Sequence, residues 1–225
     1  MSGVYLYAVL GAPAAAAGVH GLAGEPVRAL RLGDLVAAVG DVAAAPALTA
    51  ETLRAHDEVV RALGTACHAI LPARFGSLVS DETALADVLA AQAAALGDAL
   101  RLVEGCEQMT ARLFSATTAA GPEEPVLAAA SGTEYLEARL RARRRAREVR
   151  EAAPLRAHLQ GLVRAERAHR HDAPPLVASL YHLIARGRAA DYLAAVTAAA
   201  AALAPARVRA TGPWAPYAFT PEALA

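Results

Sequence analysis

Two short apolar stretches near the N-terminus are separated by only two residues, and this spacing limits the possible folds more than any other feature. The stretches run from Pro26 to Leu32 and from Leu35 to Val42, with Gly33-Asp34 between them. Two such runs joined by a glycine-containing turn predict a β-hairpin. An earlier run from Val4 to Leu10 is rich in β-branched and aromatic residues, which favour strands. The chain therefore begins with three predicted strands.

Apolar residues after this region recur at helical spacing. One set follows Thr49, a residue type that commonly caps helices, and consists of Leu53, His56, Val60, Leu63 and Cys67. An extended stretch from Ile70 to Gly76 comes next, and Pro72 favours an edge position or a strand start for it. A second helix is predicted behind Ser80 or Asp81 on the stripe Leu85, Val88, Leu89, Gln92, Leu96 and Leu100. These elements predict an N-terminal α+β domain over residues 1–102.

The second half again mixes strands and helices. A strand is predicted from Glu107 to Ser115, and a Gly- and Pro-rich loop follows from Thr117 to Pro125. A helix then begins at about Ser131, Pro154 interrupts it, and further helical turns run from Leu155 to Pro174. The last predicted elements are a strand from Leu176 to Ala185, a helix from Arg188 to Leu203 and a strand from Ala206 to Ala210. This order is close to a ferredoxin-like, or modified split βαβ, topology. We expect an α+β protein of two domains, with the C-terminal ferredoxin-like domain and its aromatic tail over residues 103–225.

The charged residues exclude several classes of function. The 22 acidic residues are balanced by 22 basic residues, so no net field draws the chain toward nucleic acid or anionic lipid. All the basic residues are Arg, which excludes a Schiff-base or P-loop lysine. Because 62 of the 225 residues are Ala, Leu and Val supply most of the predicted core.

Cysteine use and hydropathy favour a cytoplasmic protein. Cys67 and Cys106 lie in a chain without a secretory pattern, so reduced thiols are expected rather than a disulfide. The N-terminal apolar run lacks the charged region of a signal peptide. The most apolar later run, Tyr192 to Pro205, is shorter than the roughly 20 residues that span a bilayer. We expect no membrane contact.

Two groups of residues suggest chemistry but have simpler structural interpretations. The run from Arg139 to Arg150 contains seven Arg, yet interleaved Glu residues and the absence of alternating aromatics favour a solvated helix face over a nucleic-acid site. Cys67 stands next to His68, but it lies on the apolar helical stripe, which favours a buried residue over a reactive thiol. Nucleic-acid binding and thiol catalysis are therefore not expected.

A metal site is the third candidate. Its potential ligands are His169, His171, Asp172 and His182. This set lacks a second closely spaced ligand pair and precedes a Pro-Pro turn, so no metal is expected. Gly-rich phosphate loops and nucleophile elbows are also missing from the sequence. The sequence therefore predicts no catalytic residue, no metal and no cofactor.

Three aromatic residues near the C-terminus are the strongest candidates for a binding role. Trp214, Tyr217 and Phe219 lie in a stretch that Pro213 and Pro216 stiffen. A stiff aromatic segment loses little entropy when it docks, so it suits either internal packing or the anchoring of a partner. Internal packing is the favoured interpretation, and it predicts that Trp214 is substantially buried.

Arg74 and Phe75 form the second candidate. Arg74 lies between Pro72 and Phe75, and a planar guanidinium can satisfy a carboxylate and backbone acceptors together. We expect Arg74 to be buried and to pair with Asp57 or Glu58, in a structural role.

Five separated segments together resemble one family, the gas vesicle accessory proteins GvpL/GvpF. In chain order they are Val4-Tyr5-Leu6-Tyr7, His56-Asp57-Glu58-Val59-Val60, Ile70-Leu71-Pro72-Ala73-Arg74-Phe75-Gly76, Gly132-Thr133-Glu134-Tyr135-Leu136 and Thr211-Gly212-Pro213-Trp214-Ala215-Pro216-Tyr217-Ala218-Phe219. The last segment is the most specific, and the resemblance runs from residue 4 to residue 219. The Lys-free, Ala-rich composition and the short tail depart from the family pattern.

The resemblance implies a two-domain α+β protein without enzymatic activity that acts in the assembly of the gas vesicle, a hollow protein shell. It implies contact with the small hydrophobic shell protein and with other gas vesicle accessory proteins. The alternative is a small-molecule-binding or catalytic cytoplasmic α+β domain. A deep cavity lined by His, Asp or Arg would favour that alternative, whereas a flat apolar groove or an open strand edge would favour the assembly role.

Overall fold

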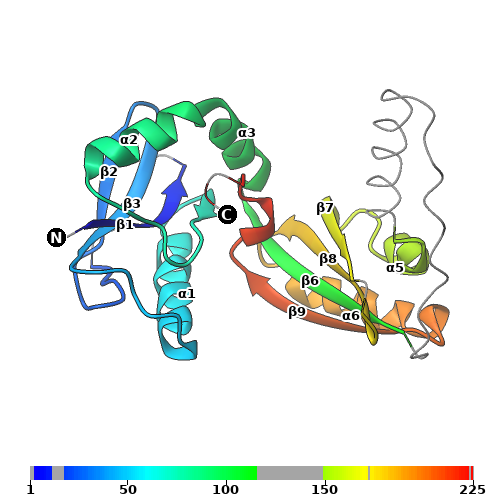
Figure 1. The fold of residues 1–225 in the computed structure, drawn as a ribbon. Helices are drawn as coiled ribbons and strands as arrows, with labels where there is room; N and C mark the ends of the chain where they lie inside the picture. The colour runs from blue at the N-terminus through cyan, green and yellow to red at the C-terminus, as the bar shows by residue number, and fades with distance from the viewer. Residues whose placement is uncertain (1–2, 12–17, 116–148, 172, 223, 225) are drawn as a thin grey trace, which may run out of the picture. The chain divides into compact units, whose positions relative to one another are not determined.

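The computed structural model describes residues 3–11, 18–115, 149–171, 173–222 and 224 (Figure 1). These residues form an α+β protein with two antiparallel sheets. The chain divides into two compact units, of which the first combines residues 1–108 with 213–225 and the second covers 109–212. The C-terminal segment therefore belongs to the same unit as the N-terminus. The predicted loop at 117–125, the start of the helix that follows it and the arginine run up to residue 148 lie outside the described residues.

The first unit is a five-stranded sheet with helices on both faces. Its elements are β1 (Gly3–Leu10), β2 (Arg28–Leu32), β3 (Leu35–Val42), α1 (Ala50–Thr65), β4 (Ile70–Pro72), β5 (Leu78–Val79), α2 (Glu82–Ala91), α3 (Ala93–Val103) and the short η3 (Tyr217–Phe219). The strand order is β2-β3-β1-β4, and β5 also pairs with β1. Figure 1 shows α1 on one side of this sheet and α2 with α3 on the other. The central strand β1 is therefore buried along nearly its whole length.

Local sequence signals explain most of these elements. The predicted hairpin is confirmed, because Leu32 pairs with Leu35 across Gly33-Asp34. Gly33 has a φ of 61°, a value that glycine adopts without strain. Thr49 caps α1, as predicted, and the structure adds a capping box between Thr49 and Thr52. β4 forms an edge of the sheet, where Pro72 is tolerated.

The second predicted helix is wrong in one respect, because the structure has two helices there. α2 and α3 meet at Gln92 and are bent by 77°. Leu89 of α2 and Leu96 of α3 are both buried, so each helix keeps an apolar side in the core on its own side of the bend.

The second unit is a four-stranded sheet whose core lies on one face. Its elements are β6 (Cys106–Phe114), η1 (Arg150–Ala152), α5 (Ala153–His158), β7 (Val163–Arg170), β8 (Leu176–Ala185), α6 (Ala189–Ala199), η2 (Ala201–Leu203) and β9 (Arg207–Trp214). The strand order is β7-β8-β6-β9, and β6 and β9 carry the chain between the two units. One buried cluster joins the strands to both helices and includes Met109, Leu155, Leu180 and Tyr192.

The helical turns predicted from Leu155 to Pro174 are wrong beyond His158. α5 ends at that residue, and β7 follows in antiparallel pairing with β8. Gly161 has a φ of 81° and lets the chain turn after α5. Pairing with a neighbouring strand then outweighs the weak helical pattern. The strand predicted from Leu176 to Ala185 is confirmed as β8.

The last predicted helix and strand are present with shifted ends. α6 is followed by η2, which together cover most of the stretch predicted as helix. β9 continues to Trp214, beyond the predicted end at Ala210. β9 is an edge strand, so the chain passes through Pro213 without removing a hydrogen bond from the interior of the sheet.

Candidate functional site

His56 lies at the centre of a buried polar network in the first unit. Its Nε2 is 3.2 Å from the carbonyl oxygen of Ala73, and its Nδ1 is 3.0 Å from the hydroxyl oxygen of Tyr5. Because a carbonyl only accepts, Nε2 carries the proton and the Tyr5 hydroxyl donates to Nδ1. The Gly76 N–H donates to the same hydroxyl oxygen at 2.9 Å. The network therefore joins α1, β1 and the turn after β4.

The environment of His56 keeps it neutral. Burial lowers the pKa of His56, although the hydrogen bond to Ala73 and the nearby Asp57 oppose this shift. The ring of Phe75 packs edge-on against His56, with the ring centroids 5.8 Å apart. Both ring nitrogens of His56 are already engaged, so the residue is arranged for packing rather than for proton transfer or metal binding.

Tyr7 and Glu25 form a second buried contact in this unit. The Tyr7 hydroxyl donates to one oxygen of Glu25 and accepts the N–H of Leu22 at 2.9 Å. The N–H of Ala23 donates to the other oxygen of Glu25 at 2.8 Å. Burial and the hydrogen bond to Glu25 raise the pKa of Tyr7, so the phenol stays protonated and continues to donate. These contacts hold the turn before β2 against the sheet.

Tyr217 and Trp214 join the C-terminal segment to α1. The Tyr217 hydroxyl donates to Oδ1 of Asp57 at 3.3 Å, and Nε of Arg61 donates to Oδ2 at 2.9 Å. The Arg61 guanidinium lies over the Trp214 ring, 5.3 Å from its centroid. Burial and the Asp57 carboxylate raise the pKa of Tyr217, which keeps its hydroxyl a donor. One turn of α1 therefore contacts two aromatic residues of the C-terminal segment.

Phe219 is the buried anchor of the same segment, with 1% of its surface exposed. The N–H of Ala218 beside it donates to Oε1 of Gln108 at 2.8 Å. The Thr220 hydroxyl on its other side donates to the carbonyl of Pro72 at 3.2 Å. The segment is thus fixed to α1, to β4 and to the start of β6.

The predicted site residues all lie in the first unit, but Arg74 differs from its prediction. Arg74 is exposed, and its backbone N–H donates to the carbonyl of Leu224 at 2.7 Å. Of the two carboxylates expected to pair with it, Asp57 and Glu58, Asp57 pairs with Arg61 instead. Because residues four apart on a helix lie side by side, Arg61 reaches Asp57 more easily than Arg74 does. Phe75, by contrast, is half-buried, and its ring lies against the buried His56.

Trp214 is also less buried than predicted, because 36% of its surface is exposed. Internal packing therefore describes Phe219 and Tyr217 better than Trp214. Sequence reasoning missed Gln108 and Glu25, whose bonds join residues far apart in the chain. The spacing of Asp57 and Arg61 on one helix face is the signal that could have identified their ion pair.

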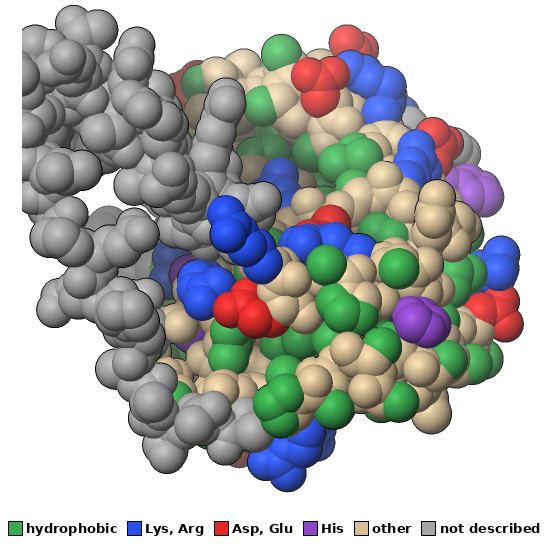
Figure 2. Space-filling view, turned by 90° about the vertical axis from the view of Figure 1, so that its right-hand side faces the viewer, with side chains coloured by type: hydrophobic (Ala, Val, Ile, Leu, Met, Phe, Trp, Pro, Cys, Tyr) green, Lys and Arg blue, Asp and Glu red, His purple; other side chains and the backbone are tan. Residues whose placement is uncertain are grey.

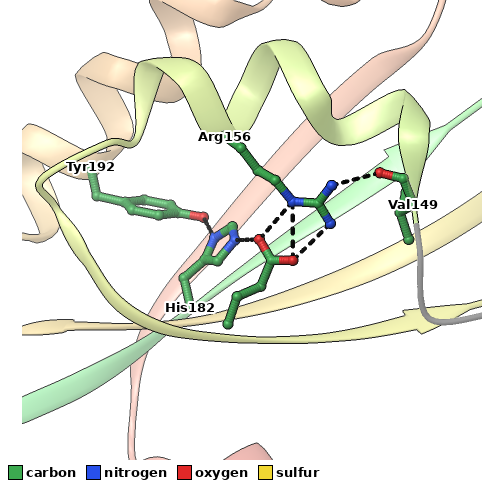
Figure 3. A network of polar contacts seen from close by, with 5 residues as sticks. Val149, Arg156, His182 and Tyr192 are labelled. Atoms are coloured by element: carbon green, nitrogen blue, oxygen red, sulfur yellow. Dashed lines mark hydrogen bonds and ion pairs between the residues drawn. The ribbon is translucent and has the colours of Figure 1, made fainter. Parts of the chain in front are cut away.

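A second polar network lies in the second unit (Figure 3). Glu166 accepts bonds from Nε and Nη2 of Arg156, the shortest at 2.8 Å, and a bond from Nε2 of His182 at 3.0 Å. The hydroxyl of Tyr192 donates to Nδ1 of His182 at 2.6 Å. Burial alone would raise the pKa of Glu166, but the bonds from His182 and Arg156 lower it to about 2. The network joins α5, β7, β8 and α6.

A cavity of about 450 Å³ lies beside this network and is lined by Arg156, Gly161, Glu166 and His182 among others. Tyr192, His182 and Glu166 are hydrogen-bonded in a row, as in a catalytic relay, but they are not placed to act on a substrate. Tyr192 is completely buried, so its hydroxyl cannot meet a substrate. In the described part of the chain, every buried side-chain nitrogen or oxygen already has a hydrogen-bond partner.

The described residues that the sequence offered for metal binding or thiol catalysis do not come together in one site. Within the described ranges, no group of three or more His, Cys, Asp or Glu side chains has a geometry that could hold a metal ion. The rings of His169 and His171 lie against each other, whereas His182 belongs to the separate network with Glu166. Cys67 and Cys106 are buried thiols, and Cys67 packs in the core, as its position on the helical stripe predicts.

The surface adds no broad apolar patch on the face drawn in Figure 2, where hydrophobic side chains are scattered among acidic and basic ones. Over the described residues, no single helix has both the length and the hydropathy to cross a bilayer, and the bent pair of α2 and α3 passes such a test only in combination.

The two-sheet α+β fold has known counterparts. Crystal structures of the gas vesicle protein GvpF from Anabaena sp. PCC7120 and from Microcystis aeruginosa superimpose with TM-scores of 0.71 and 0.69, at 18% and 15% sequence identity. The first superposition covers 98% of this chain and 97% of the other, and the second covers 96% and 98%. The fold is therefore GvpF-like.

Sequence comparison identifies the family. Residues 3–221 match the model of the family described as gas vesicle synthesis protein GvpL/GvpF. Gas vesicle protein L of Streptomyces sp. (strain CB03234) is 33% identical over an alignment of 231 positions, and the match covers 90% of this chain and 86% of that protein. The chain belongs to the GvpL/GvpF family. This is a structural and accessory family of the gas vesicle that is not known for enzymes, and membership implies association with gas vesicles.

Proposed function

We propose that this chain binds the small hydrophobic shell protein of the gas vesicle in the cytoplasm and supports nucleation or growth of the vesicle. The match to the GvpL/GvpF family over residues 3–221 carries this proposal. A shell subunit that awaits assembly exposes apolar surface and unpaired strand edges, which favour aggregation. A protein that covers these surfaces favours ordered growth. Other gas vesicle accessory proteins are further partners in this proposal, whereas nucleic acid and membranes are not.

Trp214 is the residue best placed to contact the shell protein. It combines an exposed ring with a fixed position, because Arg61 lies over one side of the ring and Phe219 anchors the following residues. Large aromatic residues held in a rigid setting dominate many protein interfaces. Arg74, Phe75, Tyr217 and Phe219 then serve to position this surface rather than to contact the partner themselves.

Co-purification tests the proposal. The tagged chain is co-expressed with the shell protein, and recovery of the shell protein is compared for wild type, Trp214→Ala and Leu48→Ala. Leu48 is the matched control, since 77% of it is exposed and it lies outside the C-terminal segment. We expect recovery to fall with Trp214→Ala alone. Failure of the wild type to retain the shell protein would overturn the function, and equal recovery from all three would overturn only the role of Trp214.

We also propose that the second unit has a ferredoxin-like arrangement. The order of its elements supports this, because α5 lies between β6 and β7 in the chain and α6 lies between β8 and β9. The strand order β7-β8-β6-β9, with β8 and β6 in the centre, supports it as well. The division of the chain into domains at residues 102 and 103 stays a prediction.

One observation favours the alternative of a small-molecule-binding or catalytic domain, namely the cavity beside Glu166 and His182. The polar groups that line the cavity already bond to one another, which leaves fewer of their hydrogen-bonding atoms available to a ligand. A thermal-shift screen of metabolites separates the two functions. A ligand that raises the melting temperature of wild type but not of Glu166→Gln would support the alternative.

A further inference from the structure

The two units carry opposite charge, although the whole chain is neutral. The first unit contains six Arg and 13 Asp or Glu residues, which gives a net charge of −7. The second contains 16 Arg and nine Asp or Glu residues, which gives +7. A chain with this distribution has no net self-repulsion, but each unit attracts the opposite unit of another copy.

Part of the positive charge is gathered on one face of the second sheet. Met109, Ala111 and Leu113 of β6 belong to the core cluster, so Arg112 between the last two points to the opposite face. Val208 and Ala210 of β9 pack on the same cluster, so Arg207 and Arg209 also point away from it. β6 and β9 are neighbours in the sheet (Figure 1). All three arginines are exposed. We call these three residues the arginine face.

The carboxylates that the structure describes in the second unit pair with other arginines. The described part of the unit has three acidic residues, Glu151, Glu166 and Asp191. They pair with Arg170, Arg156 and Arg188, respectively. The arginine face therefore concentrates charge without an acidic partner from the described residues of its own unit.

The first unit offers the complementary surface. Glu51 and Glu58 lie seven residues apart on α1 and are therefore on one side of the helix. Both are exposed, and the ion pair within α1 is formed by Asp57 and Arg61 instead. Asp34 and Asp87 are further exposed carboxylates of this unit.

We propose that the arginine face docks the acidic unit of a second copy of this chain, so that copies associate head to tail. Protection of an exposed strand edge would explain arginines on the edge strand β9. It would not explain Arg112, because β6 lies inside the sheet. Because each copy carries one surface of each kind, such contacts close into a ring, of which a two-fold pair is the smallest, or continue into short filaments.

Sedimentation velocity of the full chain at several protein concentrations tests the proposal. At roughly 0.01 M salt charges act over about 30 Å, whereas at roughly 1 M they act over about 3 Å. We expect faster-sedimenting species at low salt, growing with concentration, and their loss at high salt. The variants Arg112→Glu/Arg209→Glu and Glu51→Arg/Glu58→Arg should each lose these species. A mixture of the two variants should recover them, because one supplies the acidic helix and the other the arginine face.

Two matched variants, each with the charge of one arginine reversed, locate the contact. Arg112→Glu is compared with Arg150→Glu, whose exposed side chain lies on η1, on the helix side of the same sheet. We expect only Arg112→Glu to weaken association. The proposal is overturned if wild type sediments as one species at every salt concentration, if both reversals act equally, or if the mixture stays dissociated. It is also overturned if the arginine face binds nucleic acid while the protein remains monomeric.

Discussion

The contact between Tyr7 and Glu25 depends on a residue without a side chain. A Cβ added at Gly21 would lie 1.9 Å from Oε1 of Glu25 and 2.3 Å from the Tyr7 hydroxyl oxygen. These distances are far inside van der Waals contact, so the buried hydrogen bond would have to break or move. A larger residue fits here only if the Glu25 carboxylate moves away from Tyr7.

Gly21→Ala should therefore destabilise the protein by about 1 to 3 kcal/mol, the usual cost of overpacking. Chemical denaturation followed by circular dichroism measures this change. Gly97→Ala is the control, because Gly97 lies within α3 and its added Cβ would come no closer than 3.6 Å, to Arg101. That control should be neutral or stabilising by up to about 1 kcal/mol. Similar losses in both variants would refute the steric explanation.

His56 should make stability depend on pH. Its pKa is lowered in the folded protein, whereas an unfolded histidine titrates near about 6.5. The unfolded chain therefore binds protons first, so the free energy of unfolding falls as the pH decreases below about 6.5. His56→Gln should reduce this slope, and His68→Gln, at an exposed position, should not. Unfolding curves at a series of pH values measure both slopes, and a wild-type slope unchanged in His56→Gln would contradict the assignment.

At the scale of helices and strands, predictions succeeded where the local signal was strong. Thr49 and the glycine turn at Gly33 specified the start of α1 and the hairpin, because caps and tight turns depend on a few adjacent residues. β7 was missed, because its apolar pattern is weak and its pairing with β8 is not a local property. The bend at Gln92 was also missed, because no Gly or Pro stands at that position to mark it.

In the candidate site as well, features marked by local sequence could be predicted, and contacts that depend on the folded structure could not. The family resemblance and the stiff aromatic segment pointed to Phe75, Tyr217 and Phe219. Phe219 is buried, whereas Tyr217 and Phe75 are half-buried, Tyr217 against the core cluster and Phe75 against His56. The partner of Arg74 could not be predicted, because the choice between carboxylates depends on distances in the folded protein. Arg61, four residues from Asp57, takes that place.

The Glu166 network gives the second unit a measurable dependence on acid. The pKa of Glu166 is lowered from 4.5 to about 2, so its stabilisation is complete above about pH 4.5 and is lost as the pH falls toward 2. Glu166→Gln should cost roughly 2 to 3 kcal/mol at neutral pH, and the difference from wild type should shrink in this acid range. Unfolding measured from about pH 2 to 6 tests it. A pH-independent difference would show that packing, not charge, is lost.

At the scale of the whole molecule, the return of the C-terminus to the first unit is the main organising feature. The chain leaves that unit within β6 and re-enters it within β9, so residues from both ends build one core. Gln108 at the exit bonds Ala218 after the re-entry, which ties the two crossings together. Loss of the C-terminal segment should therefore act on the N-terminal unit, far away in sequence.

Phe219→Ala tests this closure, because Phe219 is 1% exposed and leaves a cavity when truncated. We expect a loss of about 3 to 5 kcal/mol, with amide hydrogen exchange rising in residues 18–108 and much less in 149–212. Trp214→Ala is the comparison. With 36% of its surface exposed, its truncation should cost about 1 to 2 kcal/mol. If exchange rises equally in both units, the segment stabilises the chain as a whole. If Trp214→Ala costs more than Phe219→Ala, then Trp214, and not Phe219, anchors the segment to the first unit.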